Sequence, residues 1–388
     1  MGLIEHSYLG NGRALRFLKT RVGIAERGVR MKILSFGRSM GTGGAEKVML
    51  QLIALQKKSG ISSIVCSNGG KYVDNLKNMG VKHVTIPDID SKRPRDMIKI
   101  FFKLRRIIKS ENVDIVHTHH RMAAMYIRIL NLLRIVKVRQ INTEHNIFYD
   151  KKLLTHFALS KSVNVAVGEG VKRNLTEYFK VRKSSVVTIF NSIRPPRELV
   201  PKNVMVRGHM SVISVGRLSE QKGMTYLIQA AEIVKSRVGS QVGFKIIGDG
   251  ELKEELLQEI KRRRVGDVCS LSGYSSHVFS EISHANVVVL SSLWEGLPLT
   301  PIESFACGRP VIASRIEGNA ELVSNGWNGY LVKEKSPTEL ADRILDLKED
   351  ADLLQDMSNN ALYSYKKYYS YELFCKKYLS VYGSLQGE

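Results

Sequence analysis

Two glutamates eight residues apart, Glu295 and Glu303, enclose a stiff stretch of chain that reads EGLPLTPIE. The apolar run NVVVLSS before them predicts a buried strand. Glu295 should therefore lie in the loop at the carboxyl end of that strand. A carboxylate there can accept hydrogen bonds from two neighbouring sugar hydroxyls. The residue type and its place make Glu295 a candidate substrate ligand.

The residues after Glu295 predict the start of a helix. Thr300 has the type of an N-cap, Pro301 suits the first helical position, and Glu303 stands where a capping box has its acid. A helix start presents unpaired N–H groups to phosphate, and Gly296 lets a ligand approach the backbone. Two interpretations of Glu303 stay open, because it can close the capping box or bind a ligand.

Short apolar runs alternate with helical patterns along the chain, which indicates parallel sheets covered on both faces. The runs predicted as strands are MKILSF, SSIVCS, VKHVTIP, VDIVHTH, RQINTEHN, VNVAVG, VISVGRL, GFKIIGDG, VCSLSG, NVVVLSS, PVIAS and GYLV. The pattern restarts near residue 210, so the fold class is α/β with two doubly wound, Rossmann-like domains. Such domains should bind ligands at the carboxyl ends of their strands, in a central cleft.

The same patterns suggest the domain boundaries. Residues 1–30 are expected to be a basic, poorly ordered N-terminal extension, because MKILSFGR at Met31 has the pattern of a first strand. The first domain should span 31–195 and the second 210–370. The proline-rich, aperiodic stretch 196–209 is the predicted linker. Residues 371–388 should form a C-terminal helix that caps the second domain or crosses to the first.

The positive charge is concentrated in the first half of the chain. Residues 1–200 carry 37 Lys and Arg against 14 Asp and Glu, a net charge of +23, whereas the whole chain carries +22. An anionic membrane, a phosphorylated substrate or nucleic acid could explain the excess. The four cysteines have no paired spacing, as is typical of a reducing compartment. No apolar run approaches 18 residues, which argues against a spanning helix.

The chain resembles the retaining glycosyltransferases of family 4, which have the GT-B fold, over roughly residues 31–385. EGLPLTPIE is similar to the E-x7-E motif of that family, although Asn286 upstream stands where Asp is usual. VGRLSEQKG resembles its donor-phosphate segment, and GGAE, VHTHH, TEHN, IIGDGE and NGYLV agree at spaced positions. The resemblance implies an acceptor-binding first domain and a second domain that binds a nucleotide sugar.

The resemblance also implies roles for individual residues. The donor, a UDP-sugar or GDP-sugar, would be bound by Gly43, Gly44, Arg217, Lys222, Glu295, Gly296, Leu297, Thr300 and Glu303. Arg217 and Lys222 would hold the diphosphate, Glu295 the sugar hydroxyls and Glu303 the ribose. The catalytic set would be His145, His119 and Glu295, with His145 reaching the reacting sugar. From residue type alone, each histidine at a strand end is also compatible with a structural role.

The implied reaction is transfer of a hexose-type sugar with retention, in which a leaving-group phosphate oxygen takes the acceptor proton. We expect no metal and no cofactor. The acceptor would be a glycan or a polyprenyl-diphosphate-linked glycan in bacterial capsule, exopolysaccharide or lipopolysaccharide synthesis. The expected location is cytoplasmic and peripheral on the inner membrane, because the apolar residues of the basic helix predicted over 97–108 fall on more than its core face. No specific nucleic acid is expected.

Three patterns suggest other functions. DID at 88–90 matches the D-x-D of metal-dependent glycosyltransferases of another fold, but it precedes SKRP in a predicted solvated loop. HTHH at 117–120 could ligate a metal, although no third ligand is signalled. KRRR at 261–264, with the basic first half, suggests the alternative of a non-catalytic protein that binds nucleic acid or anionic surfaces. A partly paired helix end explains KRRR better.

Overall fold

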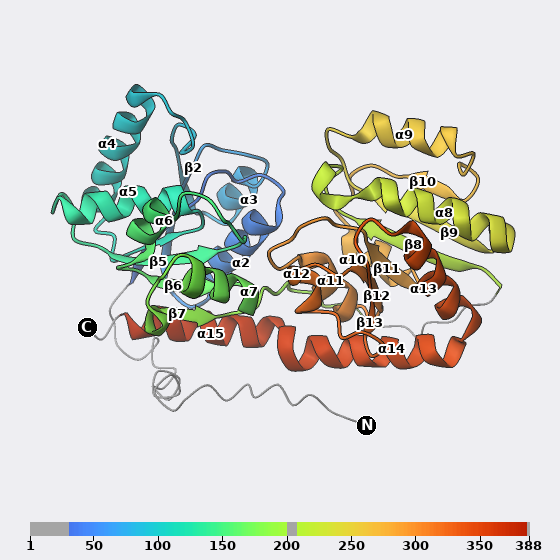
Figure 1. Ribbon diagram of the computed structural model, residues 1–388. Helices are drawn as coiled ribbons and strands as arrows, with labels where there is room; N and C mark the ends of the chain where they lie inside the picture. Colours follow the sequence, from blue (N-terminus) through green and yellow to red (C-terminus); the bar gives the residue numbers. More distant parts are fainter. Residues whose placement is uncertain (1–30, 200–207, 386–388) are drawn as a thin grey trace. The chain divides into compact units, whose positions relative to one another are not determined.

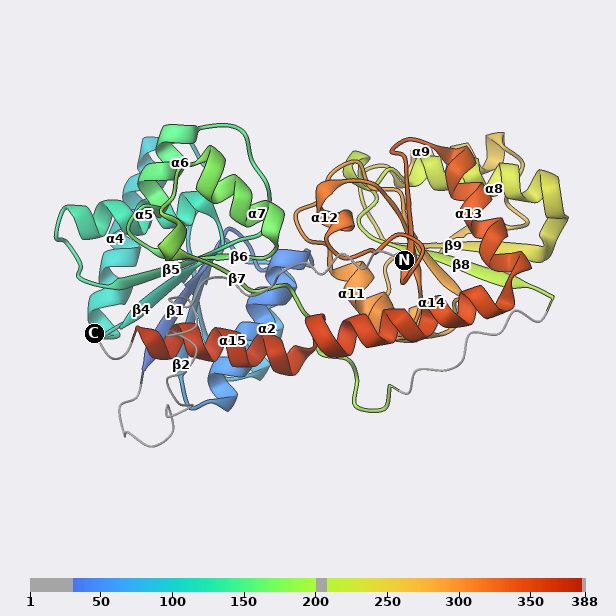
Figure 2. The same cartoon turned by 60° about the horizontal axis from the view of Figure 1, so that its bottom comes forward.

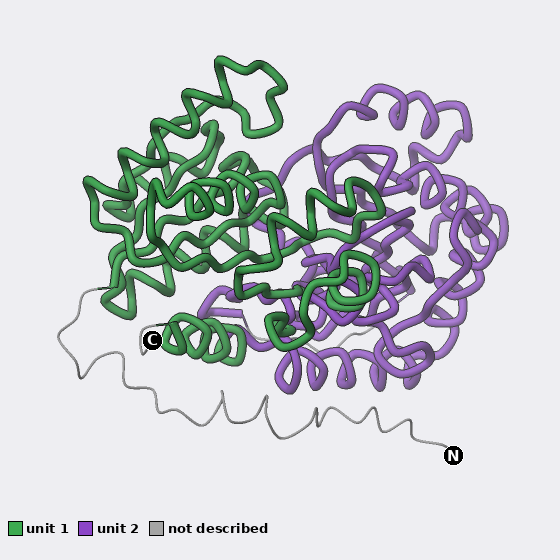
Figure 3. The backbone as a smooth tube through the Cα atoms, turned by 60° about the vertical axis from the view of Figure 1, so that its left-hand side comes forward, with its two compact units in different colours: residues 1–167, 172–189, 372–388 green, residues 168–171, 190–371 purple. Residues whose placement is uncertain are grey.

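The computed structural model describes residues 31–199 and 208–385 (Figure 1), and the chain divides into two compact units (Figure 3). Unit 1 comprises residues 1–167, 172–189 and 372–388, and unit 2 comprises residues 168–171 and 190–371. The predicted extension 1–30, residues 200–207 of the predicted linker and residues 386–388 lie outside the described residues.

Unit 1 is built on a seven-stranded parallel sheet in the order β3-β2-β1-β4-β5-β6-β7. Its strands are β1 (Lys32–Phe36), β2 (Ser62–Ser67), β3 (Lys82–Thr85), β4 (Ile115–Thr118), β5 (Arg139–Glu144), β6 (Val163–Ala166) and β7 (Val186–Thr188). The sequence predicted the first six, and β7 is an edge strand that it did not predict. The order reverses between β1 and β4, and open α/β sheets bind ligands at the carboxyl ends of the strands at such a point.

Helices cover both faces of this sheet. The helices are α2 (Gly44–Lys58), α3 (Val73–Asn78), α4 (Pro94–Ser110), α5 (Arg121–Leu132), α6 (Lys152–Leu159) and α15 (Tyr371–Ser384), whereas α7 (Glu169–Arg173) has residues in both units. Leu34 and Phe36 of β1 pack against α4 and α5, whereas Val65 of β2 points to the other face and packs against α2 and α3. Figure 2 shows α15 beside α2, and a hydrogen bond joins these two helices through Gln56 and Tyr382.

Unit 2 is built on a six-stranded parallel sheet in the order β10-β9-β8-β11-β12-β13. The strands are β8 (Met210–Val215), β9 (Val242–Ile247), β10 (Cys269–Leu271), β11 (Val287–Leu290), β12 (Val311–Ser314) and β13 (Gly329–Val332). The helices are α8 (Met224–Val238), α9 (Lys253–Arg262), α10 (Val278–Ser283), α11 (Leu299–Ala306), α12 (Glu317–Ala320), α13 (Pro337–Glu349) and α14 (Ala351–Ser364). Here the order reverses between β8 and β11. Both units therefore have the doubly wound α/β architecture that the strand pattern predicted.

Candidate active site

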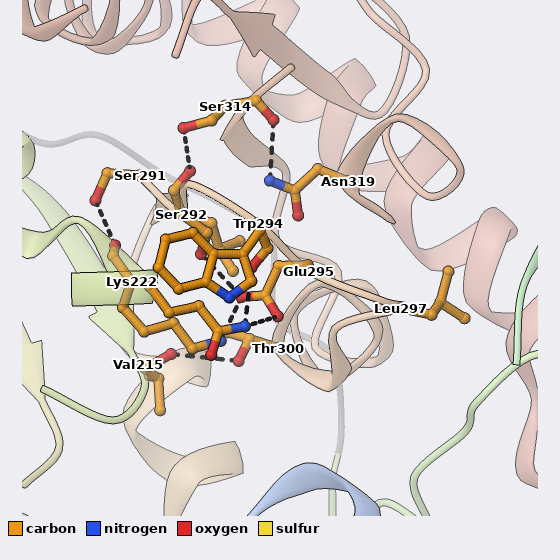
Figure 4. A network of polar contacts seen from close by, with 12 residues as sticks. Val215, Lys222, Ser291, Ser292, Trp294, Glu295, Leu297, Thr300, Ser314 and Asn319 are labelled. Carbon is orange, nitrogen blue, oxygen red and sulfur yellow. Dashed lines mark hydrogen bonds and ion pairs between the residues drawn. The ribbon is translucent and has the colours of Figure 1, made fainter. Parts of the chain in front are cut away.

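The loops that follow β8 and β11 meet at the point where the strand order of unit 2 reverses (Figure 4). Lys222 comes from the first loop and Glu295 from the second. Lys222 Nζ lies 2.5 Å from Glu295 Oε1, and the side chains are only 17% and 8% exposed. Two residues that the sequence singled out separately thus form one ion pair at the edge where open α/β sheets bind ligands.

Further hydrogen bonds orient the Glu295 carboxylate. Oε1 accepts a second hydrogen bond from Ser292 Oγ at 2.9 Å, and Oε2 accepts one from Gln221 Nε2 at 3.4 Å. Gln221 also donates to the Trp294 carbonyl at 2.8 Å. Because this long contact is the only one that Oε2 makes with the described residues, Oε2 retains capacity to accept hydrogen bonds from hydroxyl groups. Sequence reasoning missed Gln221 and Ser292, although both lie within the quoted motifs.

Gly223 explains how Lys222 reaches this position. Its backbone is left-handed, with φ of +56°, and a Cβ there would lie 2.3 Å from the Ser291 carbonyl oxygen. Only glycine combines that conformation with such a close approach. Ser291 Oγ in turn donates to the Lys222 carbonyl at 3.1 Å. A backbone hydrogen bond from Leu293 N–H to the Gln221 carbonyl, at 2.8 Å, also joins the two loops. These contacts bring Lys222 within reach of Glu295.

Arg217 differs from Lys222 in its surroundings. Its side chain is 73% exposed and pairs with the half-exposed Glu251 at 3.1 Å. An exposed ion pair of this kind contributes at most about 1 kcal/mol. An anionic ligand can therefore take the place of Glu251 at little energetic cost.

The segment after Glu295 forms a helix start that differs from the predicted one. Helix α11 begins at Leu299 after an extended Pro298, and the structure has no side-chain cap there. The predicted capping box is therefore wrong: Thr300 is already inside the helix and donates to the Val215 carbonyl at 3.3 Å. Pro301 fits the third position because the first N–H groups of a helix need no internal partner. Glu303, a turn into the helix, is buried.

The other predicted donor residues lie on the same loop of unit 2. The backbone of Gly296 is approached so closely by α12 that a Cβ on Gly318 would lie 2.3 Å from the Gly296 carbonyl oxygen. The Leu297 carbonyl accepts a hydrogen bond from Asn191 Nδ2 at 2.9 Å. Asn191, which the sequence did not suggest, therefore fixes the loop from outside the motif.

In unit 1, Gly43 and Gly44 lie at the start of α2. Gly44 is its first residue, and Gly43 precedes it in an extended conformation without a side-chain cap. Glu46 folds back over this turn, where its Oε1 accepts a hydrogen bond from Ser39 Oγ at 2.6 Å. A Cβ on Gly43 would lie 2.5 Å from Glu46 Oε2, so a larger residue there would require the Glu46 carboxylate to move.

His119 and His145 meet at the carboxyl ends of β4 and β5. His119 Nδ1 lies 3.3 Å from His145 Nε2, and the rings are stacked. Burial lowers the pKa of His145 to about 4 and that of His119 well below its usual value. His119 Nε2 is buried and has no hydrogen-bond partner among the described residues. The two predicted histidines thus form one neutral pair, in which a buried nitrogen lacks a partner in the described structure.

Sequence reasoning did not single out Glu144, the residue before His145. Its side chain is buried, and Oε2 has no hydrogen-bond partner within the described ranges. Burial raises the pKa of Glu144 to about 7 against the opposing effect of Arg121. Arg121 is itself bound to Asp150 at 2.6 Å. The sequence does not show whether the carboxyl group of Glu144 is buried, so this residue could be recognised only from the structure.

The patterns that suggested metal binding have other partners. The two acids of DID, Asp88 and Asp90, both bind Arg38, at 2.8 and 2.9 Å. His117 of HTHH uses both ring nitrogens for hydroxyl groups, those of Tyr382 and Thr143. Within the part of the chain that the structure describes, no group of three or more His, Cys, Asp or Glu is arranged to hold a metal ion.

The KRRR segment is a partly paired helix end, as the sequence suggested. Arg262 and Arg263 both bind Glu259, at 2.6 and 2.5 Å, and Arg263 also binds Glu232. This pairing weakens the case for a nucleic-acid surface in unit 2.

Two family models match adjoining parts of the chain. The model described as Glycosyltransferase Family 4 matches residues 42–197, and the model described as Glycosyl transferases group 1 matches residues 198–362. The chain belongs to glycosyltransferase family 4. It is therefore a glycosyltransferase enzyme, and the resemblance seen in its motifs is confirmed.

Relatives of this family 4 glycosyltransferase agree with that assignment. The chain is 26% identical to the UDP-Gal:alpha-D-GlcNAc-diphosphoundecaprenol alpha-1,3-galactosyltransferase of Escherichia coli, over 82% of this chain and 87% of the relative. It is 25% identical to an uncharacterized glycosyltransferase of Methanocaldococcus jannaschii, over 68% of this chain and 74% of the relative.

Solved structures establish the fold of the family 4 enzyme. The crystal structure of Anabaena Alr3699/HepE in complex with UDP and glucose matches with a TM-score of 0.77 and 19% identity, over 92% of this chain and all of that one. The predicted GT-B fold is confirmed.

Proposed function

We propose that this glycosyltransferase moves a hexose-type sugar, with retention, from a nucleotide-diphosphate sugar to a hydroxyl group. The observation that carries the proposal is the Lys222–Glu295 pair at the point where the strand order of unit 2 reverses. A nucleotide-diphosphate sugar has an anionic diphosphate, which a cation can bind, and sugar hydroxyls, which a carboxylate can bind. Lys222 and the weakly paired Arg217 suit the diphosphate, and Glu295 Oε2 suits the sugar hydroxyls. Glu303 is assigned to the ribose.

The proposed reaction breaks the bond between the anomeric carbon and the diphosphate oxygen and forms a bond from that carbon to the acceptor oxygen. The acceptor proton passes to a phosphate oxygen of the leaving nucleotide. Backbone N–H groups at the start of α11, with Gly296, Leu297 and Thr300, stabilise the developing charge. In this proposal Gly43 and Gly44 belong to the donor-binding residues, and neutral His145 and His119 orient the sugar and the acceptor.

The acceptor is proposed to be a glycan or a polyprenyl-diphosphate-linked glycan in bacterial capsule, exopolysaccharide or lipopolysaccharide synthesis. The name of the Escherichia coli relative specifies a diphosphoundecaprenol-linked acceptor and a UDP-sugar donor. The basic first half of this chain fits an acceptor that carries phosphate. The base of the donor is proposed to be uridine or guanosine, and thermal unfolding can distinguish them.

Thermal unfolding with UDP, GDP, ADP and CMP tests the donor site. We expect one diphosphate at 100 times its dissociation constant to add about 2.7 kcal/mol, which raises the melting temperature by on the order of 5–10 °C. Arg217→Ala should abolish this shift with little change in the unliganded melting temperature, because its ion pair is exposed. Arg237→Ala, which removes another exposed pair at 2.6 Å in unit 2, is the matched control and should retain the shift.

A shift that survives in Arg217→Ala would remove Arg217 from the donor site. No shift with any nucleotide would favour the alternative function, a non-catalytic protein that binds nucleic acid or anionic surfaces through its basic half.

Activity is proposed to be independent of divalent metal ions. Lys222 and Arg217 supply the positive charge that a metal ion would bring to the diphosphate. We expect transfer rates in excess EDTA to stay within about twofold of those in untreated buffer. A loss of activity in EDTA that manganese restores would contradict this prediction.

Helix α4 supports a further part of the proposal, association with an anionic membrane surface. Its sequence has six Lys and Arg against one Asp, and Ile100 and Leu104 on its inner face are buried. Phe102 and Ile98 are 67% and 55% exposed on the rest of the helix. Apolar side chains among cations suit insertion into the headgroup region of anionic lipid. No helix in the described ranges is long and apolar enough to cross a membrane.

Co-sedimentation with liposomes tests this membrane surface. Partition of the wild type should rise with the fraction of anionic lipid and fall with salt. The double variant Ile98→Ser, Phe102→Ser should reduce partition at least about tenfold, because each buried side chain of this size contributes roughly 1.5–3 kcal/mol. Leu257→Ser alters an exposed apolar residue of α9 and serves as the control. Sedimentation that ignores anionic lipid content would refute the proposal.

A further inference from the structure

Two tyrosines of the last helix contact the interior of unit 1. Tyr378 and Tyr382 are four residues apart, so they lie on one face of α15, and both side chains are fully buried. Buried phenol groups need hydrogen-bond partners. Their partners lie on β4, β5 and α2, where hydroxyl, imidazole and amide groups are also buried.

These partners form a continuous chain of hydrogen bonds. Gln56 Nε2 donates to the Tyr382 hydroxyl at 2.9 Å, and that hydroxyl lies 3.0 Å from His117 Nδ1. His117 Nε2 lies 2.8 Å from Thr143 Oγ1, which lies 3.1 Å from the Tyr378 hydroxyl. With the amide of Gln56 so oriented, Nδ1 of His117 is the one acceptor that the described residues offer to the proton of the Tyr382 hydroxyl. His117 must then carry its own proton on Nε2 and donate to Thr143.

The middle member of this chain, His117, packs against the candidate catalytic pair. The His117 ring lies 4.3 Å from that of His119, and both side chains project from the same face of β4. Thr143 precedes His145 by two residues, so these two side chains project from the same face of β5. Burial lowers the pKa of His117 to about 3, so the ring that packs against His119 is neutral. The position of the His119 ring therefore depends on how His117 is held.

We propose that Tyr382, Tyr378 and Thr143 are positioning residues that fix the His119–His145 pair through His117. The proposal rests on the proposed function, in which that pair orients sugar and acceptor. It gives α15 a role in the reaction besides its packing. The helix supplies the Tyr382 hydroxyl, which contacts His117 directly, and the Tyr378 hydroxyl, which acts on His117 through Thr143. His117 in turn packs against His119. Loss of a hydroxyl group leaves a buried imidazole nitrogen unpaired, and the ring then reorients.

Four variants test the proposal. Tyr382→Phe removes one hydroxyl group, and Thr143→Val removes another with little change of shape. Thr143→Ser keeps the hydroxyl group and should restore wild-type behaviour. Tyr365→Phe is the matched control, because this tyrosine of unit 2 donates a part-buried hydrogen bond to the Ile193 carbonyl at 3.1 Å. Nitrogen-15 NMR of the histidines and steady-state kinetics are measured for each.

We expect Tyr382→Phe and Thr143→Val to lower kcat about tenfold, because each variant loses one interaction that positions the histidine pair. The donor KM should stay within about twofold, because neither residue binds the donor. The NMR signals of His117 should lose the Nε2-protonated pattern, and those of His119 and His145 should shift. Thr143→Ser and Tyr365→Phe should keep both the kinetics and the signals. Unchanged His119 and His145 signals in Tyr382→Phe, or an equal loss of kcat in Tyr365→Phe, would overturn the proposal. Because NMR needs no substrate, an inactive wild type would refute the proposed function and leave this test intact.

Discussion

Replacing Lys222 with alanine is expected to lower kcat/KM at least about 100-fold, the usual effect of losing one preorganised donor at a charged transition state. The same change should lower the free energy of unfolding by about 2 kcal/mol. Breaking a fully buried ion pair removes about 3–5 kcal/mol. The smaller value applies here because both side chains keep some exposure and Glu295 retains the hydrogen bonds from Ser292 and Gln221.

Two further variants separate these effects. Lys245→Ala removes a lysine–glutamate pair of the same unit, at 2.7 Å but more exposed, and should change neither activity nor stability by much. The double variant Lys222→Met, Glu295→Gln leaves no unpaired buried charge, so it should recover stability without recovering activity. Enzyme kinetics and urea unfolding measure the two quantities. Activity of Lys222→Ala within threefold of wild type would remove Lys222 from the reaction.

The strands were predictable because buried parallel strands are short, continuous apolar runs. Of the described strands, β7 was missed: it has three residues, lies at the edge of its sheet and exposes Val187. The start of α11 was misplaced because Thr300-Pro301 has the composition of a helix start, whereas the extended Pro298 is the N-cap and the helix begins at Leu299. Local pattern identifies residue types that suit a cap, but contacts with β8 decide which of them is used.

The motifs identified Lys222 and Glu295 separately, but no local pattern joins residues 73 positions apart. Their contact follows from the strand order, which places the loops after β8 and β11 side by side. The same limit applies to His117, which suggested a metal site by its spacing from His119. Its real partner, Tyr382, is 265 residues away in sequence. The sequence therefore predicted which residues have side chains suited to ligand binding, and the order of the strands determines which of those residues come into contact.

The buried histidines of unit 1 should make the enzyme sensitive to acid. The pKa values are about 3 for His117 and about 4 for His145, and that of His119 is also far below its usual value, because burial disfavours the charged ring. Below about pH 6.5 the unfolded chain binds protons at these sites and the folded chain does not. Stability is therefore lost as the pH falls, by about 1.4 kcal/mol per pH unit for each histidine.

Glu144 acts in the opposite direction. Its pKa of about 7 lies above the unfolded value. Its contribution to the free energy of unfolding is therefore present at low pH and is lost as the pH rises towards 7. Between pH 5 and 6, three histidines and one glutamate give a net uptake of about two protons on unfolding. These four groups should thus make the free energy of unfolding fall by roughly 3 kcal/mol per pH unit in this range. Burial also lowers the pKa values of His120 and His83, which adds to the fall.

Urea unfolding at several pH values between 5 and 7.5 measures this slope, and two substitutions assign it. His117→Gln should make the slope shallower by about one proton. Glu144→Gln should make it steeper by about one proton, because the compensating group is lost. His277→Gln, at an exposed position of unit 2, is the control and should leave the slope unchanged. A wild-type slope near zero between pH 5 and 6 would mean that the histidines are protonated in the folded enzyme. That result would contradict the assignment of His119 and His145 as a neutral pair, on which the proposed acceptor site depends.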